Sequence, residues 1–127
     1  MKLSLLVPAA AIAALGAAAA LAAGPAPDPV KGKAVFARCM ACHDLNTGAN
    51  RIGPSLKGVI GRKAGTYPGY AYSPAMKAKG AVWNAATLDS YLTAPTTYVP
   101  GNKMPLAPMT NAQDRANLIA YLQQAAK

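Results

Sequence analysis

The pattern of hydrophobic and polar positions predicts helices separated by long loops. Asp28 followed by Pro29 is typical of a helix start, because aspartate caps free N–H groups and proline suits the first helical position. We expect this helix to extend to about residue 41. Gly32 and Phe36 lie four residues apart in it and therefore share one face.

Two later segments also carry apolar residues at helical spacing. The first, over residues 85–94, follows the capping residue Asn84 and ends at Pro95, which cannot continue a helix. The second begins near Thr110, where Gln113 would complete a capping box. The apolar stripes are Leu88, Tyr91 and Leu92 in the first segment and Leu118, Tyr121 and Leu122 in the second.

The remaining segments contain many turn-forming residues. Residues 44–69 are rich in glycine, asparagine and proline, so they are expected to form loops. Ser73 and Pro74 predict a short helix through Lys77. No stretch shows the alternation typical of a strand, so the fold class is predicted to be all-α, with three main helices, short helices and long loops.

The N-terminal segment is typical of a secretory signal peptide. Lys2 is followed by 21 uncharged residues, and residues 20–22 form the A-x-A pattern that signal peptidase requires. An uncleaved membrane anchor is the alternative, because an apolar stretch of this length could just span a bilayer. The predicted division is therefore a signal peptide (1–22), a Gly/Pro linker (23–29) and one domain (30–127).

Basic residues outnumber acidic ones: the chain has 13 Lys and Arg against 4 acidic residues, and its net charge is +9. Only one acidic residue, Asp44, lies between Lys31 and Lys79. A positive surface of this kind predicts steering of an acidic protein partner. Nucleic acid is not an expected partner of an exported protein, whereas anionic lipid headgroups are a secondary candidate.

The candidate chemistry lies in five residues, Cys39-Met40-Ala41-Cys42-His43, which contain both cysteines and the single histidine. A C-x-x-C-H run is typical of covalent c-type haem attachment, with histidine as an iron ligand. A structural zinc site needs about four Cys or His ligands, and this chain has only three. A thioredoxin-like motif should accompany a βαβ pattern, which the sequence does not show. A plain disulfide would leave the histidine unexplained. A covalent haem would also add apolar surface to the hydrophobic core, which is small in a domain of this size.

A histidine ligand leaves the opposite face of the iron to a methionine or to an open site. Met40 lies inside the attachment motif and cannot reach that face. Met76, Met104 and Met109 are the remaining candidates, each of which could instead be ordinary core. Met104 lies in a loop stiffened by prolines, and Met109 is the runner-up.

Taken together, residues 32–122 resemble a class I cytochrome c of the mitochondrial and bacterial c2 type. The matching segments are 32–36, 39–43, 52–56, 61–65, 83, 88–92, 98–104 and 118–122. The resemblance implies the class I cytochrome c fold, wrapped around one covalently bound haem c. It also implies a one-electron carrier, not an enzyme, whose iron cycles between Fe(II) and Fe(III).

The resemblance further implies roles for individual residues. Cys39 and Cys42 would hold the haem, and His43 and Met104 would be the two iron ligands. The carbonyl of Pro54 would accept a hydrogen bond from the histidine and fix its ring.

The other implied site residues surround the haem. Arg62, Tyr72 and Trp83 would hold the haem propionates, and Tyr91 would donate a hydrogen bond near the methionine sulfur. Asn102 stands where the family often has threonine, so a modified propionate contact is expected there.

The expected function is electron transport in a respiratory or photosynthetic chain, by a soluble periplasmic monomer. Its donor would be a quinol-oxidising complex or a dehydrogenase, and its acceptor a terminal oxidase, a reaction centre or a peroxidase. These partners would dock through acidic surfaces onto lysines that include Lys33, Lys57, Lys63 and Lys103. The alternatives are a haem enzyme or sensor with a displaceable methionine, and a carrier tethered to the membrane by an uncleaved N-terminus.

Overall fold

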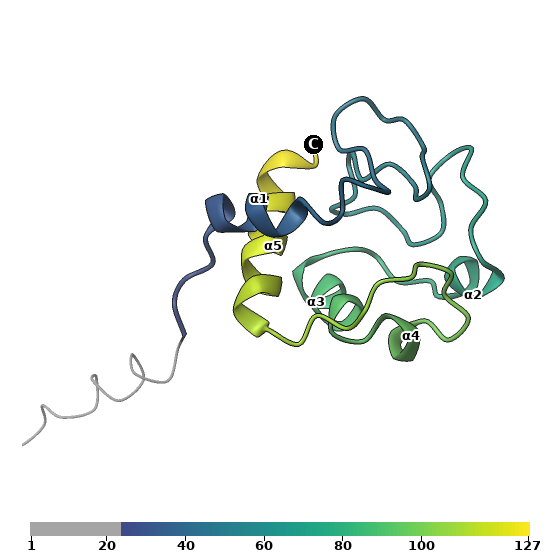
Figure 1. Cartoon of the computed structure of the whole chain (residues 1–127). Coiled ribbons are helices and arrows are strands. Elements are labelled where there is room, and N and C mark those ends of the chain that lie inside the picture. Colours follow the sequence, from purple (N-terminus) through teal and green to yellow (C-terminus); the bar gives the residue numbers. More distant parts are fainter. Residues whose placement is uncertain (1–23) are drawn as a thin grey trace, which may run out of the picture.

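The computed structural model describes residues 24–127. Its helices are α1 (Pro29–Phe36), α2 (Pro74–Ala78), α3 (Ala85–Thr93), α4 (Pro95–Tyr98) and α5 (Ala112–Ala125), joined by long loops (Figure 1). The described part contains no strand, and one isolated antiparallel bridge joins Lys63 and Val82. The prediction of an all-α fold with three main helices is therefore confirmed. The predicted signal peptide lies outside the described residues.

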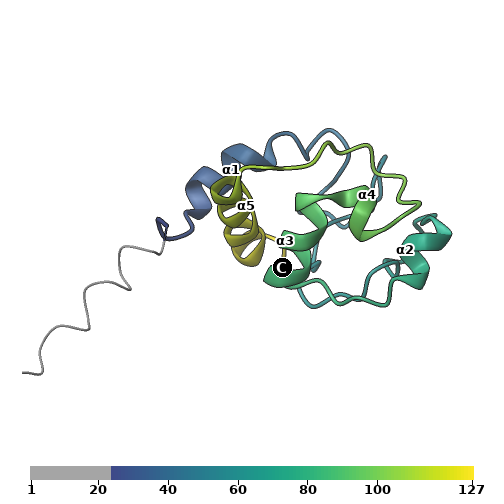
Figure 2. The same cartoon turned by 90° about the horizontal axis from the view of Figure 1, so that it is seen from below.

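Helices α1 and α5 cross beside the two loop-rich halves of the domain (Figures 1 and 2). Gly32 permits this crossing, because a Cβ atom at its position would lie 1.9 Å from the carbonyl oxygen of Asn117. The rings of Phe36 and Tyr121 pack with centroids 5.4 Å apart, and Leu118 is fully buried. The first and last helices of the chain thus form one wall of the core.

Helix α1 begins as predicted but ends earlier. The side chain of Asp28 accepts hydrogen bonds from the backbone of Val30 and Lys31. The predicted end near residue 41 is wrong, because α1 ends at Phe36. Beyond it the N–H of Cys39 donates to the carbonyl of Phe36, three residues back, at 2.8 Å. This tighter bonding converts residues 37–42 into turns.

Helix α3 has the predicted start, where Asn84 and Thr87 form a reciprocal capping box. Pro95 does end α3, but it also occupies the first position of α4, a short helix that the sequence pattern did not predict. Proline stops one helix and starts the next because it lacks an N–H group.

Helix α5 starts two residues later than expected, at Ala112. The predicted capping box between Thr110 and Gln113 is wrong. Asn111 is the cap, and its side chain accepts from the N–H of Asp114 at 2.9 Å. Both Thr110 and Asn111 are good capping residues, so local preference alone could not choose between them.

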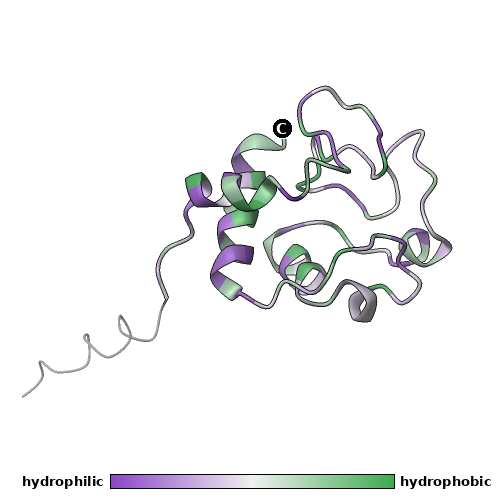
Figure 3. Cartoon of the chain, viewed as in Figure 1, coloured by the Kyte–Doolittle hydropathy of each residue, from purple (hydrophilic) through white to green (hydrophobic). Residues whose placement is uncertain are grey.

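The inward faces of α3 and α5 supply much of the core. Their buried residues include Leu88, Tyr91 and Leu92 of α3 and Leu118, Ile119 and Leu122 of α5. In Figure 3, α3 and α5 each contain both hydrophobic and hydrophilic residues, as expected of helices with one face in the core. No helix of residues 24–127 is long and apolar enough to cross a membrane.

Candidate haem site

A cavity of about 500 Å³ opens between the loops and helices α3 and α5. Its volume lies in the range of cofactor pockets, roughly 300–1,000 Å³. All ten predicted site residues line it: Cys39, Cys42, His43, Pro54, Arg62, Tyr72, Trp83, Tyr91, Asn102 and Met104. The other lining residues are mainly apolar. The structure therefore brings together residues that are up to 65 positions apart in the chain.

The attachment segment occupies the turns that follow α1. Cys39 and Cys42 are half-buried free thiols rather than a disulfide. The N–H groups of Cys42 and His43 both donate to the carbonyl of Cys39, at 3.1 and 2.9 Å. Burial raises the pKa of the Cys39 thiol, although the neighbouring Arg38 acts in the opposite direction. These turns present both sulfur atoms and the imidazole to the same cavity.

The imidazole of His43 is held by the loop that follows it. Its Nδ1 lies 2.7 Å from the carbonyl oxygen of Pro54. A carbonyl can only accept, so Nδ1 carries the proton and Nε2 keeps a free lone pair. Burial lowers the pKa of His43, while the bond to Pro54 acts in the opposite direction. The neutral tautomer that can bind a metal through Nε2 is thus the one this contact selects.

Gly53 is a site residue that the sequence reasoning missed. A Cβ atom at this position would lie 2.4 Å from Cε1 of His43. The missing side chain therefore lets the ring lie against the backbone of the loop. The only sequence signal was its place directly before Pro54, and that signal indicates a turn as readily as a contact.

The loop that carries Met104 is organised by the side chain of Asn102. Its Oδ1 accepts hydrogen bonds from the hydroxyl of Tyr91 at 2.9 Å and from the N–H of Met104 at 3.2 Å. Its Nδ2 donates to the carbonyl of Met104 at 3.3 Å. The Tyr91 hydroxyl also lies 3.9 Å from the sulfur of Met104. Asn102 thus shapes the methionine loop with both ends of its amide.

Tyr91 remains a hydrogen-bond donor over a wide pH range. Burial raises its pKa to about 12, and the hydrogen bond to Asn102 partly opposes that shift. Its ring packs against Trp83, with centroids 5.1 Å apart. The hydroxyl that faces the Met104 sulfur is therefore protonated at neutral pH.

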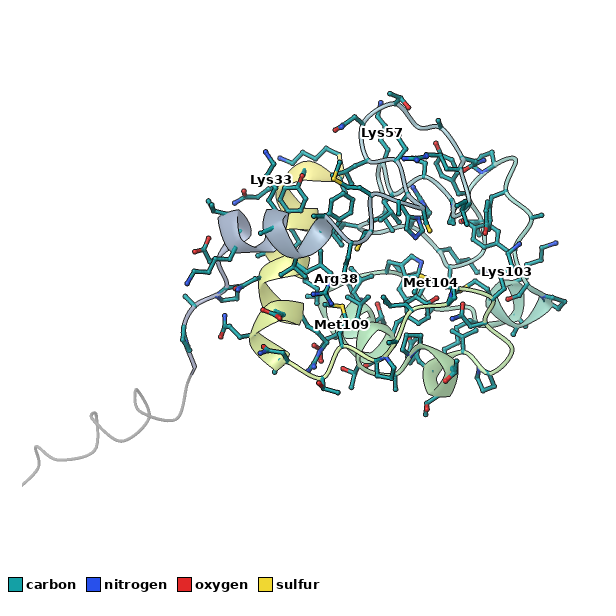
Figure 4. All side chains as sticks on the ribbon, in the orientation of Figure 1. Lys33, Arg38, Lys57, Lys103, Met104 and Met109 are labelled. Carbon is teal, nitrogen blue, oxygen red and sulfur yellow. The ribbon has the colours of Figure 1, made fainter. Side chains whose placement is uncertain are left out.

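The methionines occupy different environments. Met104 is partly buried and lines the cavity, as does the buried Met76. Met109 is 5% exposed and packs in the core, and Met40 is 57% exposed. Neither of these two lines the cavity. Figure 4 shows that Met104 and Met109, although near in sequence, occupy separate places in the molecule.

Arg62 brings a positive charge to the cavity wall. Its guanidinium donates to the carbonyl of Ser55 at 2.7 Å and to that of Lys57, and it lies 4.3 Å from the ring centroid of Tyr67. Burial lowers its pKa, which remains far above neutral because guanidinium is a very strong base. The hydroxyl of Tyr72 accepts from the N–H of Tyr67 at 3.2 Å.

The donor set fits a haem better than a bare metal ion. Residues 24–127 contain no group of three or more His, Cys, Asp or Glu side chains that could hold a metal ion. Two thiols, a neutral imidazole and a thioether instead share a large apolar cavity that also contains a guanidinium. These are the groups that covalent attachment, iron ligation and neutralisation of propionates require.

Comparison with known proteins gives a consistent result. The model of the family described as cytochrome c matches residues 29–126. Cytochrome c2 of Rhodomicrobium vannielii is 49% identical over 106 residues, which cover 83% of this chain and 82% of that protein. Cytochrome c2 of Rhodoblastus acidophilus is 50% identical over 98 residues, covering 76% and 92%.

Among solved structures, cytochrome cH from Methylobacterium extorquens superimposes with a TM-score of 0.73 and 41% identity, covering 76% of this chain and 98% of its own. The class of protein that the sequence resembles is thus confirmed, and so is haem c as the cofactor attached at Cys39 and Cys42. The chain belongs to the cytochrome c family, as an electron carrier of the cytochrome c2 type rather than an enzyme.

Proposed function

We propose that the chain is a diffusible periplasmic carrier of single electrons whose iron is held by His43 and Met104. The observation that carries this proposal is the shared cavity. The imidazole with its free Nε2 and the thioether of Met104 both line it. The imidazole is bonded to the carbonyl of Pro54, and the backbone N–H of Met104 is bonded to the side chain of Asn102. Met109 packs in the core away from the cavity, which favours Met104 as the second ligand.

The residues around the cavity would keep the ligands in one arrangement in both oxidation states. Haem supplies the one-electron chemistry, and a thioether ligand with apolar surroundings favours Fe(II). Pro54 fixes the His43 ring, while Asn102 and Tyr91 fix the Met104 loop. Because neither ligand needs to move, little reorganisation accompanies electron transfer.

Three further side chains are proposed to hold the haem propionates. Arg62 would neutralise them, since a partly buried guanidinium favours a nearby carboxylate. Tyr72 and Trp83 line the same cavity and carry O–H and N–H groups that can donate to carboxylate oxygens. Asn102 is committed to the backbone of Met104 and to Tyr91, so its contribution would come through the methionine loop.

Redox partners are proposed to dock where the attachment segment reaches the surface. Met40 is 57% exposed and Ile52 is 72% exposed, and the side chain of Arg51 bonds the carbonyl of Met40 at 2.9 Å. Arg38 and Lys57 are also exposed, and Figure 4 labels both of them together with Lys33. Apolar contact ringed by cations suits an acidic surface on a quinol-oxidising complex, a terminal oxidase or a reaction centre.

The ligand set is tested by the optical spectrum of the purified haem protein, oxidised and reduced, with and without carbon monoxide. We expect a methionine-to-ferric-iron charge-transfer band and no carbon monoxide shift. Met104→Ala should abolish the band, whereas Met109→Ala should retain it. Ready carbon monoxide binding by the wild-type protein would contradict the closed site and point to a sensor or enzyme.

The location is tested on the exported protein. N-terminal sequencing should find a chain that starts near residue 23, with a net charge one unit lower because Lys2 is removed. An intact Met1 in a membrane fraction would instead support the tethered carrier.

A further inference from the structure

A half-buried positive charge at the cavity wall has no negative partner among the described residues. Arg62 lines the cavity, and its guanidinium donates to the backbone carbonyls of Ser55, at 2.7 Å, and Lys57. A guanidinium carries five N–H groups, and Arg62 makes no further hydrogen bond or ion pair with the described residues. Its other donors can therefore serve a group in the cavity, provided that the guanidinium is held in place.

The ring of Tyr67 covers one face of this guanidinium. The Cζ atom of Arg62 lies over the ring, 4.3 Å from its centroid, which is the stacked arrangement of a cation–π contact. Tyr67 is half-buried and does not line the cavity, so its ring lies on a side of the guanidinium other than the one that faces the cavity. The ring thereby displaces water from that side of Arg62.

Contacts at both ends of Tyr67 hold its ring in this position. Its hydroxyl donates to the carbonyl of Gly48 at 2.8 Å, and its backbone N–H donates to the hydroxyl of Tyr72 at 3.2 Å. A Cβ atom at Gly48 would lie 3.0 Å from the Tyr67 hydroxyl, so glycine leaves room for this approach. The carbonyl of the next residue, Pro68, accepts a hydrogen bond from the side chain of Asn50 at 2.9 Å. The ring is therefore fixed relative to the backbone on which Arg62 depends.

We propose that Tyr67 is a positioning residue for Arg62. Its ring holds the guanidinium at the cavity wall and shields it from water, so the positive charge acts on carboxylates in the cavity with less screening. Tyr67 does not line the cavity, and its ring acts only through Arg62. This inference rests on the proposed contact of Arg62 with the haem propionates and names the group that orients Arg62 for that contact.

The covering of Arg62 is tested by the rate at which phenylglyoxal modifies each arginine of the purified haem protein, followed by mass spectrometry. Tyr67→Leu removes the ring but keeps the backbone N–H that bonds Tyr72. Arg62 should then react about two- to fivefold faster, the factor expected for loss of an exposed cation–π contact. Tyr67→Phe keeps the ring and should react at close to the wild-type rate. Arg38 is exposed and should react at the same rate in every variant.

The midpoint potential tests the effect of Tyr67 on the haem. Tyr67→Leu should lower the potential, because a more hydrated Arg62 neutralises the propionates less and their negative charge favours Fe(III). Tyr67→Phe should retain the wild-type potential. In an Arg62→Gln background, Tyr67→Leu should leave the potential unchanged, since the ring acts only through the guanidinium.

Thr66→Ala is the matched control for both measurements. It removes the hydrogen bond from the Thr66 hydroxyl to the carbonyl of Lys63, at 2.6 Å in the same turn, and leaves the Tyr67 ring in place. Neither the reaction rate of Arg62 nor the potential should change.

The outcomes separate the role of Tyr67 from the proposed contact with the propionates. Equal phenylglyoxal rates at Arg62 in the wild-type and Tyr67→Leu proteins would overturn the role of Tyr67. A lower potential in Tyr67→Leu that persists in the Arg62→Gln background would also overturn it, because the ring would then act by another route. Faster modification of Arg62 with an unchanged potential would support positioning by Tyr67 and contradict the contact of Arg62 with the propionates.

Discussion

At the scale of single residues, the site depends on polar groups that fix two ligand side chains. The carbonyl of Pro54 selects the tautomer of His43, and the amide of Asn102 holds the backbone of Met104. Tyr91 is the most buried of these residues, and its hydroxyl bonds Asn102 and faces the Met104 sulfur. A buried hydroxyl with two such neighbours contributes to stability and to ligand placement together.

Tyr91→Phe should lower the free energy of unfolding by about 1 kcal/mol at pH 7, since it removes one buried hydrogen bond. Because the pKa of Tyr91 is raised to about 12 in the folded protein, the unfolded chain loses this proton first, near pH 10. The stabilisation from Tyr91 is therefore complete below pH 10 and is lost as the pH rises to 12. Denaturant unfolding measured from pH 10 to pH 12 should show the free energies of unfolding of the wild-type protein and the variant approaching each other.

Tyr121→Phe is the matched control at pH 7. Its ring packs on Phe36, and its hydroxyl makes no side-chain hydrogen bond among the described residues. A change within about 0.5 kcal/mol is expected there. Equal losses in the two variants would contradict the assigned role of Tyr91.

At the scale of elements, local patterns predicted the starts of α1 and α3 and the end of α3 before Pro95, but not the cap of α5 or the end of α1. The caps Asp28 and Asn84 were found because their hydrogen bonds are local. The end of α1 was not predicted, because the apolar spacing continues past Phe36 while the backbone changes to turns with hydrogen bonds three residues back, as from Cys39 to Phe36. The C-x-x-C-H run also predicted the attachment site, because its residues are adjacent in the sequence. The role of Gly53 could not be predicted in this way, because its contact with the His43 ring forms only in the folded chain.

Gly32→Ala tests the crossing of α1 and α5. In an exposed helix this change should stabilise by about 0.5–1 kcal/mol, because alanine favours the helix. Here the new Cβ would lie 1.9 Å from the backbone of Asn117, so we expect a loss of about 1–3 kcal/mol or more. Denaturant unfolding measures the change.

Lys33→Ala is the control for this prediction, since Lys33 is exposed in the same helix. Its effect should stay within about 0.5 kcal/mol. A stabilised Gly32→Ala protein would show that the two helices can separate without penalty.

At the scale of the whole molecule, a net charge of +9 acts on partners at a distance. Some cations already make contacts within the molecule. Arg115 pairs with Asp89 at 2.8 Å, and the ammonium of Lys79 lies 3.9 Å from the ring centroid of Tyr98. Arg38 is exposed at the edge of the cavity, beside the attachment segment. Position as well as charge should therefore decide which cations steer partners.

Electron transfer with an acidic redox partner should slow as ionic strength rises, because salt screens the attraction. At low salt, Arg38→Gln should lower the second-order rate about two- to threefold. Lys77→Gln loses the same charge at an exposed position on α2 that does not line the cavity, and it should have little effect. Stopped-flow kinetics measure both, and a rate independent of salt would exclude steering.

The cavity has a consequence for how the protein is made. Nine of the fifteen buried apolar residues line it, including Phe36, Trp83 and Leu118, so its wall and the hydrophobic core are largely the same set of side chains. Before the cofactor is attached, these residues face the cavity instead of the cofactor, so the domain buries less apolar surface and is less stable. We therefore expect cofactor attachment to precede folding, and we expect a chain that misses its cofactor to be degraded instead of accumulating as an inactive carrier.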